Sequence, residues 1–163
     1  MGPYAYGVPS DDDTPGHDPE DLRRTSLPQL IALAGHVVNR QWHRITQQHG
    51  VSAAGANALL MLKDGPAVHR EVAHRCWLHP STMTGIVDTL VRDALVTRTR
   101  SETDRRQVLL ALTPRGSALV RDLGLEIEKR FAAVENAVDE RAEVVREFLI
   151  DTILTDATSE GTR

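Results

Sequence analysis

The chain has 163 residues, of which 40% are hydrophobic and only 4% aromatic, and its formal net charge is −4. This length and composition suit a single domain, or a small two-part unit, with an aliphatic core. No run approaches the roughly 20 apolar residues of a membrane span, which excludes a membrane-spanning protein. The N-terminus shows no secretion signal and the single cysteine excludes an internal disulfide, so we expect a cytoplasmic protein.

The acidic net charge comes from the first part of the chain. Residues 1–21 are rich in Gly, Pro and Asp, show no periodicity and contain no Lys or Arg. We therefore expect a disordered acidic tail there. Without this tail the chain has a slight excess of basic residues, so the net charge does not exclude an anionic partner.

Two amphipathic helices are predicted after the tail. Ser26 can cap the first, whose apolar stripe runs over residues 27–45 and ends before Gly50. Ser52 can cap the second, and the turn signal Asp64-Gly65-Pro66 closes it.

The next segment predicts two helices separated by a short break. The second of them starts at Pro80, because proline suits the first turn of a helix, where its missing N–H costs nothing. Its outward positions are short and mostly hydrogen-bonding, so this helix can lie close against a flat, polar surface. The apolar positions are Val72, Ala73 and Cys76 on the first helix and Met83, Ile86, Val87 and Leu90 on the second, with the break at Trp77-Leu78-His79.

Two strands joined by a charged turn follow these helices. Val96–Arg100 and Gln107–Leu112 have β-type composition, and Ser101–Arg106 lies between them. Two helices and an arginine-tipped hairpin predict a winged helix-turn-helix in an α+β, mostly α, fold. The second helix suits a major groove, and the tip suits phosphates or the neighbouring minor groove. The sequence therefore predicts a DNA-binding module.

Long apolar helices flank this module. Thr113-Pro114 starts a helix that runs through Val134, and a last amphipathic helix covers about Asp139–Asp156. The stripes over residues 27–45 and 119–153 are more apolar than one small module needs, which permits a dimer built from the terminal helices. The alternative is a monomer whose helices fold over their own core.

An ordered series of motifs in this segment resembles the MarR (multiple antibiotic resistance regulator) family of bacterial transcription factors. The resemblance implies a homodimer that binds a pseudopalindromic operator and most often represses. The motifs are E-V-A-x-R at Glu71–Arg75, H-P-S-T-M-T at His79–Thr84, V-D-x-L at Val87–Leu90, A-L-V-x-R at Ala94–Arg98, D-R-R at Asp104–Arg106 and L-T-P-x-G at Leu112–Gly116.

Four positions depart from the family pattern. Trp77 and Ala94 stand where the family usually has Gly, His79 where Ser usually caps, and Gly85 where Arg is frequent. We expect these spans: an acidic tail over 1–21, a dimerisation helix over 22–51, the DNA-binding lobe over 52–112, dimerisation helices over 113–157 and a polar end over 158–163.

Candidate DNA contacts fall on the second helix and the hairpin. Hydroxyls can bond bases or phosphates, and arginines can bind phosphate or enter a narrow minor groove. By resemblance, Asp104 braces the tip and an arginine beside it enters the minor groove. Arg92, Arg98 and Arg100 either bind phosphate or pair with Asp88 and Asp93. The predicted contacts are Ser81, Thr82, Thr84, Thr89, Arg98, Arg100, Asp104, Arg105 and Arg106.

The sequence also bears on an effector site and on a metal site. The family commonly binds aromatic acids or other phenolic compounds, and His36, Arg40, Trp42 and His43 can supply a cation, a donor and an aromatic wall; they are equally natural as solvated residues around a buried Trp42. The histidines form no cluster with acidic ligands, so we expect no metal and no cofactor besides such an effector. Cys76 is expected in the core.

The competing function classes are weaker. No catalytic motif is present, so we expect no enzyme. A winged-helix protein-interaction module without specific DNA binding is the alternative, although the hairpin arginines serve no apolar partner. The acidic tail either solvates the protein or competes with DNA for the basic face.

Overall fold

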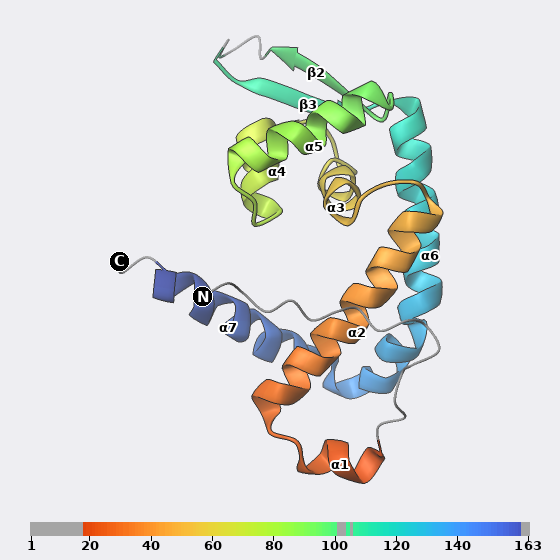
Figure 1. Ribbon diagram of the computed structural model, residues 1–163, viewed down its shortest axis with the longest axis vertical. Helices are drawn as coiled ribbons and strands as arrows, with labels where there is room; N and C mark the ends of the chain where they lie inside the picture. Colours follow the sequence, from red (N-terminus) through yellow and green to blue (C-terminus); the bar gives the residue numbers. More distant parts are fainter. Residues whose placement is uncertain (1–17, 101–103, 105, 161–163) are drawn as a thin grey trace, which may run out of the picture. The chain divides into compact units, whose positions relative to one another are not determined.

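The computed structural model describes residues 18–100, 104 and 106–160 (Figure 1). The chain divides into two compact units, one that ends at Arg40 and one that begins at Gln41. No helix in the described part is long and apolar enough to cross a membrane.

The first unit holds a short helix that the sequence analysis missed. Helix α1 (Pro19–Arg24) occupies the end of the segment expected to be disordered up to Asp21, so that expectation was wrong there. The Asp18 carboxylate accepts a hydrogen bond from Glu20 N (2.9 Å), and a proline stands in the first turn. These local caps define α1, which buries none of its residues. Residues 1–17 lie outside the described part of the chain.

Helices α2 (Leu27–Gln48) and α3 (Ala53–Met61) form as predicted. The Ser52 hydroxyl accepts from Gly55 N (3.0 Å) at the start of α3, which confirms the predicted cap. The division between the two compact units falls within α2, so its residues up to Arg40 belong to the first unit and its residues from Gln41 to the second.

The lobe that was expected to bind DNA is built from three helices and a three-stranded antiparallel sheet of order β1-β3-β2. The central strand β3 pairs through Leu110 with Ala67 on one side and with Arg98 on the other. Figure 1 shows the β2–β3 hairpin beside α5. After α3, the elements are β1 (Ala67–Val68), α4 (His69–Arg75), α5 (Pro80–Arg92), β2 (Val96–Arg100) and β3 (Val108–Leu112).

Strand β1 corrects the predicted topology. Only two strands were expected, yet Ala67–Val68 forms a third, in which Val68 pairs with Leu109 of β3. Two residues are too few to show the alternating pattern of a strand. This strand exists only because the edge of β3 is free to pair with it. The strand predicted from Gln107 begins one residue later, at Val108.

One aliphatic core holds the lobe together. The inward stripe predicted for α5 is largely confirmed, because Met83 and Val87 are fully buried and Leu90 nearly so, whereas Ile86 is half-buried. Each fully buried aliphatic side chain contributes about 1.5–3 kcal/mol. The other buried members come from α3 and its C-cap, α4, the turn before β2, and the sheet: Ala58, Leu59, Leu62, Val72, Ala73, Leu95, Val96 and Leu110.

Three helices of the second unit end in the same left-handed turn. Its central residue has positive φ at Gly50 (68°), Trp77 (56°) and Ala94 (56°). In each case the N–H of the following residue bonds to the carbonyl oxygen five residues back, which closes a Schellman motif. Glycine adopts this conformation freely, whereas for other residues the left-handed conformation costs roughly 1–2 kcal/mol of conformational free energy. The closing bonds are Val51 N to Thr46 O (3.0 Å), Leu78 N to Ala73 O (3.0 Å) and Leu95 N to Leu90 O (2.9 Å).

Helix α6 (Pro114–Val138) is tied directly to the lobe. The Thr113 hydroxyl donates to Ala94 O (2.7 Å) and accepts from Gly116 N (3.0 Å). Gly116 is required by close approach, because a Cβ atom there would overlap the Leu95 carbonyl oxygen. This contact gives a physical reason for the L-T-P-x-G motif.

The C-terminal end continues through a short 3-10 helix, η1 (Asp139–Arg141), into α7 (Ala142–Glu160). A second small core joins the end of α2 to α3 and α6 through Ile45, Ala56 and Leu123. Helix α7 has no comparable burial, because its large apolar side chains from Val144 to Leu154 are exposed in the single chain.

Candidate nucleic-acid interface

The candidate interface begins at the turn between α4 and α5. His79 takes the N-cap position, where its Nδ1 accepts from Ser81 N (3.4 Å) and lies 2.8 Å from Ser81 Oγ. Pro80 follows in the first turn. His79 therefore replaces the usual Ser with a side chain that still caps the helix.

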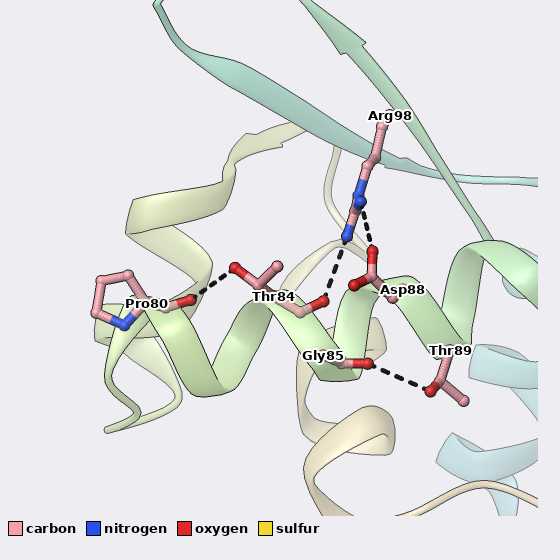
Figure 2. Close-up of polar contacts among 6 residues, drawn as sticks. All are labelled: Pro80, Thr84, Gly85, Asp88, Thr89 and Arg98. Atoms are coloured by element: carbon pink, nitrogen blue, oxygen red, sulfur yellow. Dashed lines mark hydrogen bonds and ion pairs between the residues drawn. The ribbon is translucent and has the colours of Figure 1, made fainter.

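The four hydroxyl residues predicted to contact DNA are all exposed on α5. Figure 2 shows that Thr84 Oγ1 donates to Pro80 O (3.0 Å) and Thr89 Oγ1 to Gly85 O (3.2 Å). Since these donors are used within the helix, Thr84 and Thr89 offer outward lone pairs and methyl groups. A Cβ atom on Gly85 would meet nothing within 4 Å, so the front of α5 is shallow and open.

Arg98 of β2 holds the hairpin to this helix. Its Nη1 lies 2.7 Å from Asp88 Oδ1, and its Nη2 donates to Thr84 O at 3.3 Å (Figure 2). Sequence reasoning left open whether Arg98 pairs with an acid or binds phosphate, and the structure shows the pairing. Arg92 similarly pairs with the neighbouring Asp93 (3.3 Å).

The hairpin tip is organised by Asp104. Its Oδ1 accepts from Arg106 N (3.0 Å) and its Oδ2 from Gln107 Nε2 (3.1 Å). The carboxylate therefore fixes the backbone that carries the exposed Arg106 side chain. Arg100 is exposed on β2, while Arg105 lies outside the described residues.

A hollow of about 700 Å³ lies between α4 and the hairpin tip. Arg70 and His74 line it together with Arg106. Sequence reasoning missed these two α4 residues, although their i, i+4 spacing places them on one helix face. Burial lowers the pKa of His69, also in this hollow, below its ordinary value of 6.5; the Arg98 cation lowers it further, against Asp88.

A smaller hollow of about 380 Å³ borders α5. The turn before α3, from Gly50 to Ser52, forms one wall, and Thr82, Gly85 and Thr89 form the other. Two predicted contact residues therefore line a depression rather than a flat face.

The remaining predicted site residues lie on α2. His36 and His43 are exposed, and neither hollow above is lined by any of the four predicted ligand residues. Trp42 packs against the small second core, and its Nε1 is buried with no hydrogen-bond acceptor among the residues that the structure describes. The effector site stays a prediction, as does the part that Arg40 plays in it.

Cysteine and metal chemistry receive no support here. Burial raises the pKa of the Cys76 thiol, against the opposing effect of Arg75, and Cys76 packs against the lobe core. A thiol with a raised pKa is a poor nucleophile at neutral pH. In the described residues, no three His, Cys, Asp or Glu side chains are grouped to hold a metal ion.

Comparison with known proteins agrees with this geometry. The model of the MarR family matches residues 64–108. Over 112 residues the chain is 30% identical to the homoprotocatechuate degradative operon repressor of Escherichia coli, a match that covers 68% of this chain and 75% of that protein. The chain belongs to the MarR family. This is a family of transcription factors rather than of enzymes.

Two further relatives show the extent of the MarR likeness. The chain is 34% identical over 80 residues to the HTH-type transcriptional regulator FarR of Neisseria gonorrhoeae, covering 48% of this chain but only about half (54%) of FarR. CouR from Rhodococcus jostii, solved on a 23-mer DNA duplex, has a TM-score of 0.65 at 22% identity and covers 86% of this chain and 98% of that one.

At two positions where the chain departs from the MarR pattern, the backbone has the conformation that the usual glycine would favour. Trp77 and Ala94 replace usual glycines, and both have positive φ. The missing glycines were therefore a sequence signal of backbone strain at the two ends of α5.

Proposed function

We propose that this chain is a homodimeric transcriptional repressor that binds a pseudopalindromic operator and is released by a small phenolic effector. The observation that carries the proposal is the single unit formed by α5 and the hairpin. Arg98 joins the exposed front of α5 to a hairpin whose tip presents Arg106 from an Asp104-braced turn. A helix for the major groove and a cation for phosphate or the minor groove are thus held in one geometry.

The apolar surface of α7 supports the homodimer. Val144, Leu149, Ile153 and Leu154 are between 46% and 72% exposed in the single chain. Exposed apolar surface of this extent marks an interaction site. A two-fold pairing of such helices sets two recognition helices about one DNA turn apart, which gives the operator its inverted symmetry.

The relatives support repression rather than activation. The 30%-identical protein is named as a repressor of an operon that degrades homoprotocatechuate, a phenolic acid, and the CouR structure contains a DNA duplex. A repressor of bacterial genes acts in the cytoplasm, where the chromosome lies.

Trp42 is the residue of this chain that best supports a phenolic effector. Its indole N–H is buried without an acceptor in the described part of the chain, and such a donor gains a partner from a carboxylate or phenolate. His36, Arg40 and His43 of the same helix would add donors and a cation. Effector binding would favour a dimer whose recognition helices no longer match the half-site spacing.

The test is selection of bound sequences from a random duplex pool at near-physiological salt. The proposal predicts an inverted repeat with half-sites about one helical turn apart. No enrichment, or binding that vanishes uniformly as salt rises, leaves only phosphate attraction and favours an interaction module. With the selected duplex, phenolic acids should release the wild-type protein, whereas Trp42→Phe should release less readily.

A further inference from the structure

Trp77 is an exposed tryptophan in a strained position. It is 67% exposed, whereas the other tryptophan, Trp42, is half-buried in the second core. Its φ of 56° belongs to the left-handed region, where glycine is favoured. The indole therefore neither fills the core nor suits its own backbone, and the folded chain alone gives no reason for it.

Ala94 shows that the fold does not need a large side chain in this turn. It occupies the equivalent position at the other end of α5, with the same φ of 56° and with a following N–H that bonds five residues back in the same way. The two turns are matched in backbone and differ in side chain. Only the turn before α5 carries an aromatic ring.

The position of Trp77 points to DNA as its contact. It lies two residues before His79, the N-cap of α5, and directly after Cys76, the C-cap of α4. In a helix-turn-helix, the start of the second helix enters the major groove while the first helix crosses the strand backbone. The turn between them therefore meets the edge of the groove. The exposed His74 and Arg75 in the last turn of α4 add donors suited to phosphate beside it.

We propose that Trp77 is a DNA-contact residue that packs its indole ring on the sugar–phosphate backbone at the edge of the half-site and donates its Nε1–H to a phosphate oxygen. This inference rests on the proposed function. Tryptophan suits the role because it has a broad apolar body and one donor. The indole is neutral, so the contact adds affinity without releasing a counterion.

The test compares Trp77→Gly with Ala94→Gly on the duplex selected with the wild-type protein. Both variants remove a side chain from a left-handed residue, so both should raise the urea midpoint of unfolding. Trp77→Gly should lower DNA affinity about tenfold, as for loss of one hydrogen bond and its apolar contact. Ala94→Gly should leave affinity unchanged. Trp77→Phe, which keeps a ring but loses the donor, should fall between them.

The salt dependence of binding distinguishes a direct contact of Trp77 with DNA from an indirect effect in which the substitution moves charged groups. The loss of affinity in Trp77→Gly should be the same factor at every salt concentration, whereas Arg106→Ala should flatten the salt slope by about one unit. In addition, acrylamide quenching of the wild-type tryptophan emission should fall on binding the duplex, and this protection should be absent in Trp77→Phe.

Three results would overturn the inference alone. Equal affinity of Trp77→Gly and the wild type would remove Trp77 from the interface while leaving the proposed function intact. A changed salt slope would mean that Trp77 acts by moving charged groups. A changed sedimentation mass of free Trp77→Gly would assign the indole to a contact between chains. If the wild type selects no duplex, the proposed function fails and this inference fails with it.

Discussion

The lobe and helix α7 use apolar residues in opposite ways. In the lobe, Leu59, Val72, Met83 and Leu110 are fully buried within one chain. In α7, Val144 is 72% exposed, and its apolar neighbours up to Leu154 are also exposed. The apolar side chains of the lobe are therefore buried within a single chain, whereas those of α7 form the kind of exposed apolar surface that marks an interaction site. The predictions below test this difference.

The largest effect is expected from a cavity in the lobe. Met83→Ala should lower the free energy of unfolding by about 2–5 kcal/mol, because Met83 is fully buried. The measurement is urea unfolding at several protein concentrations. Thr82→Ala, at the neighbouring exposed position, should change stability by no more than about 0.5 kcal/mol. Equal losses in the two variants would show that the lobe core is not the stable part of the chain.

The next effect should break the dimer while leaving the lobe folded. Leu149→Asp combined with Ile153→Asp places two charges on the exposed apolar surface of α7. The sedimentation mass should halve, and operator affinity should fall at least about 100-fold because two half-sites are no longer bound together. Lys129→Asp changes the net charge equally at an exposed position of α6 and should leave the mass unchanged. A double variant that retains the wild-type mass would exclude α7 from the interface.

A smaller effect is expected inside the lobe, between the hairpin and α5. Arg98 is 32% exposed and Asp88 58%, so solvent screens their ion pair. A double-mutant cycle of Arg98→Ala and Asp88→Ala should give a coupling of about 0.2–1 kcal/mol in urea unfolding. Additive losses would mean that the two side chains do not interact in solution.

The smallest effect should appear as a pH dependence of lobe stability. Because the pKa of His69 is lowered, the folded state favours the neutral ring. Its stability contribution should be complete above the ordinary pKa of 6.5 and should decline as pH falls below that value. His69→Gln should reduce the decline in urea midpoint between about pH 7.5 and about pH 5.5. An equal decline in the variant would assign it to other groups.

The elements that could be predicted from the sequence have strong local signals. Ser52 caps α3, Pro80 begins α5, and the apolar spacing of α5 matches its buried face. Strand β1 could not be predicted, because two residues become a strand only through their pairing with β3. Helix α1 was missed for a different reason, since the acidic composition that predicts disorder also supplies the Asp18 cap.

The sequence predicted which residues of the candidate site are exposed, but not which of them contact one another. Exposure of Ser81, Thr82, Thr84 and Thr89 follows from helical periodicity. The pairing of Arg98 with Asp88 does not, because it depends on the register between β2 and α5. The effector residues on α2 remain predictions, since no contact in the described residues tests them.

The central claim is that the lobe is buried within one chain whereas α7 pairs with a second chain. The sedimentation mass of the protein, free and on the selected duplex, tests this claim most directly. We expect twice the 18.0 kDa chain mass for the free protein and two chains on each duplex that carries both half-sites. A free mass of one chain, with a single chain bound per duplex at full affinity, would contradict it.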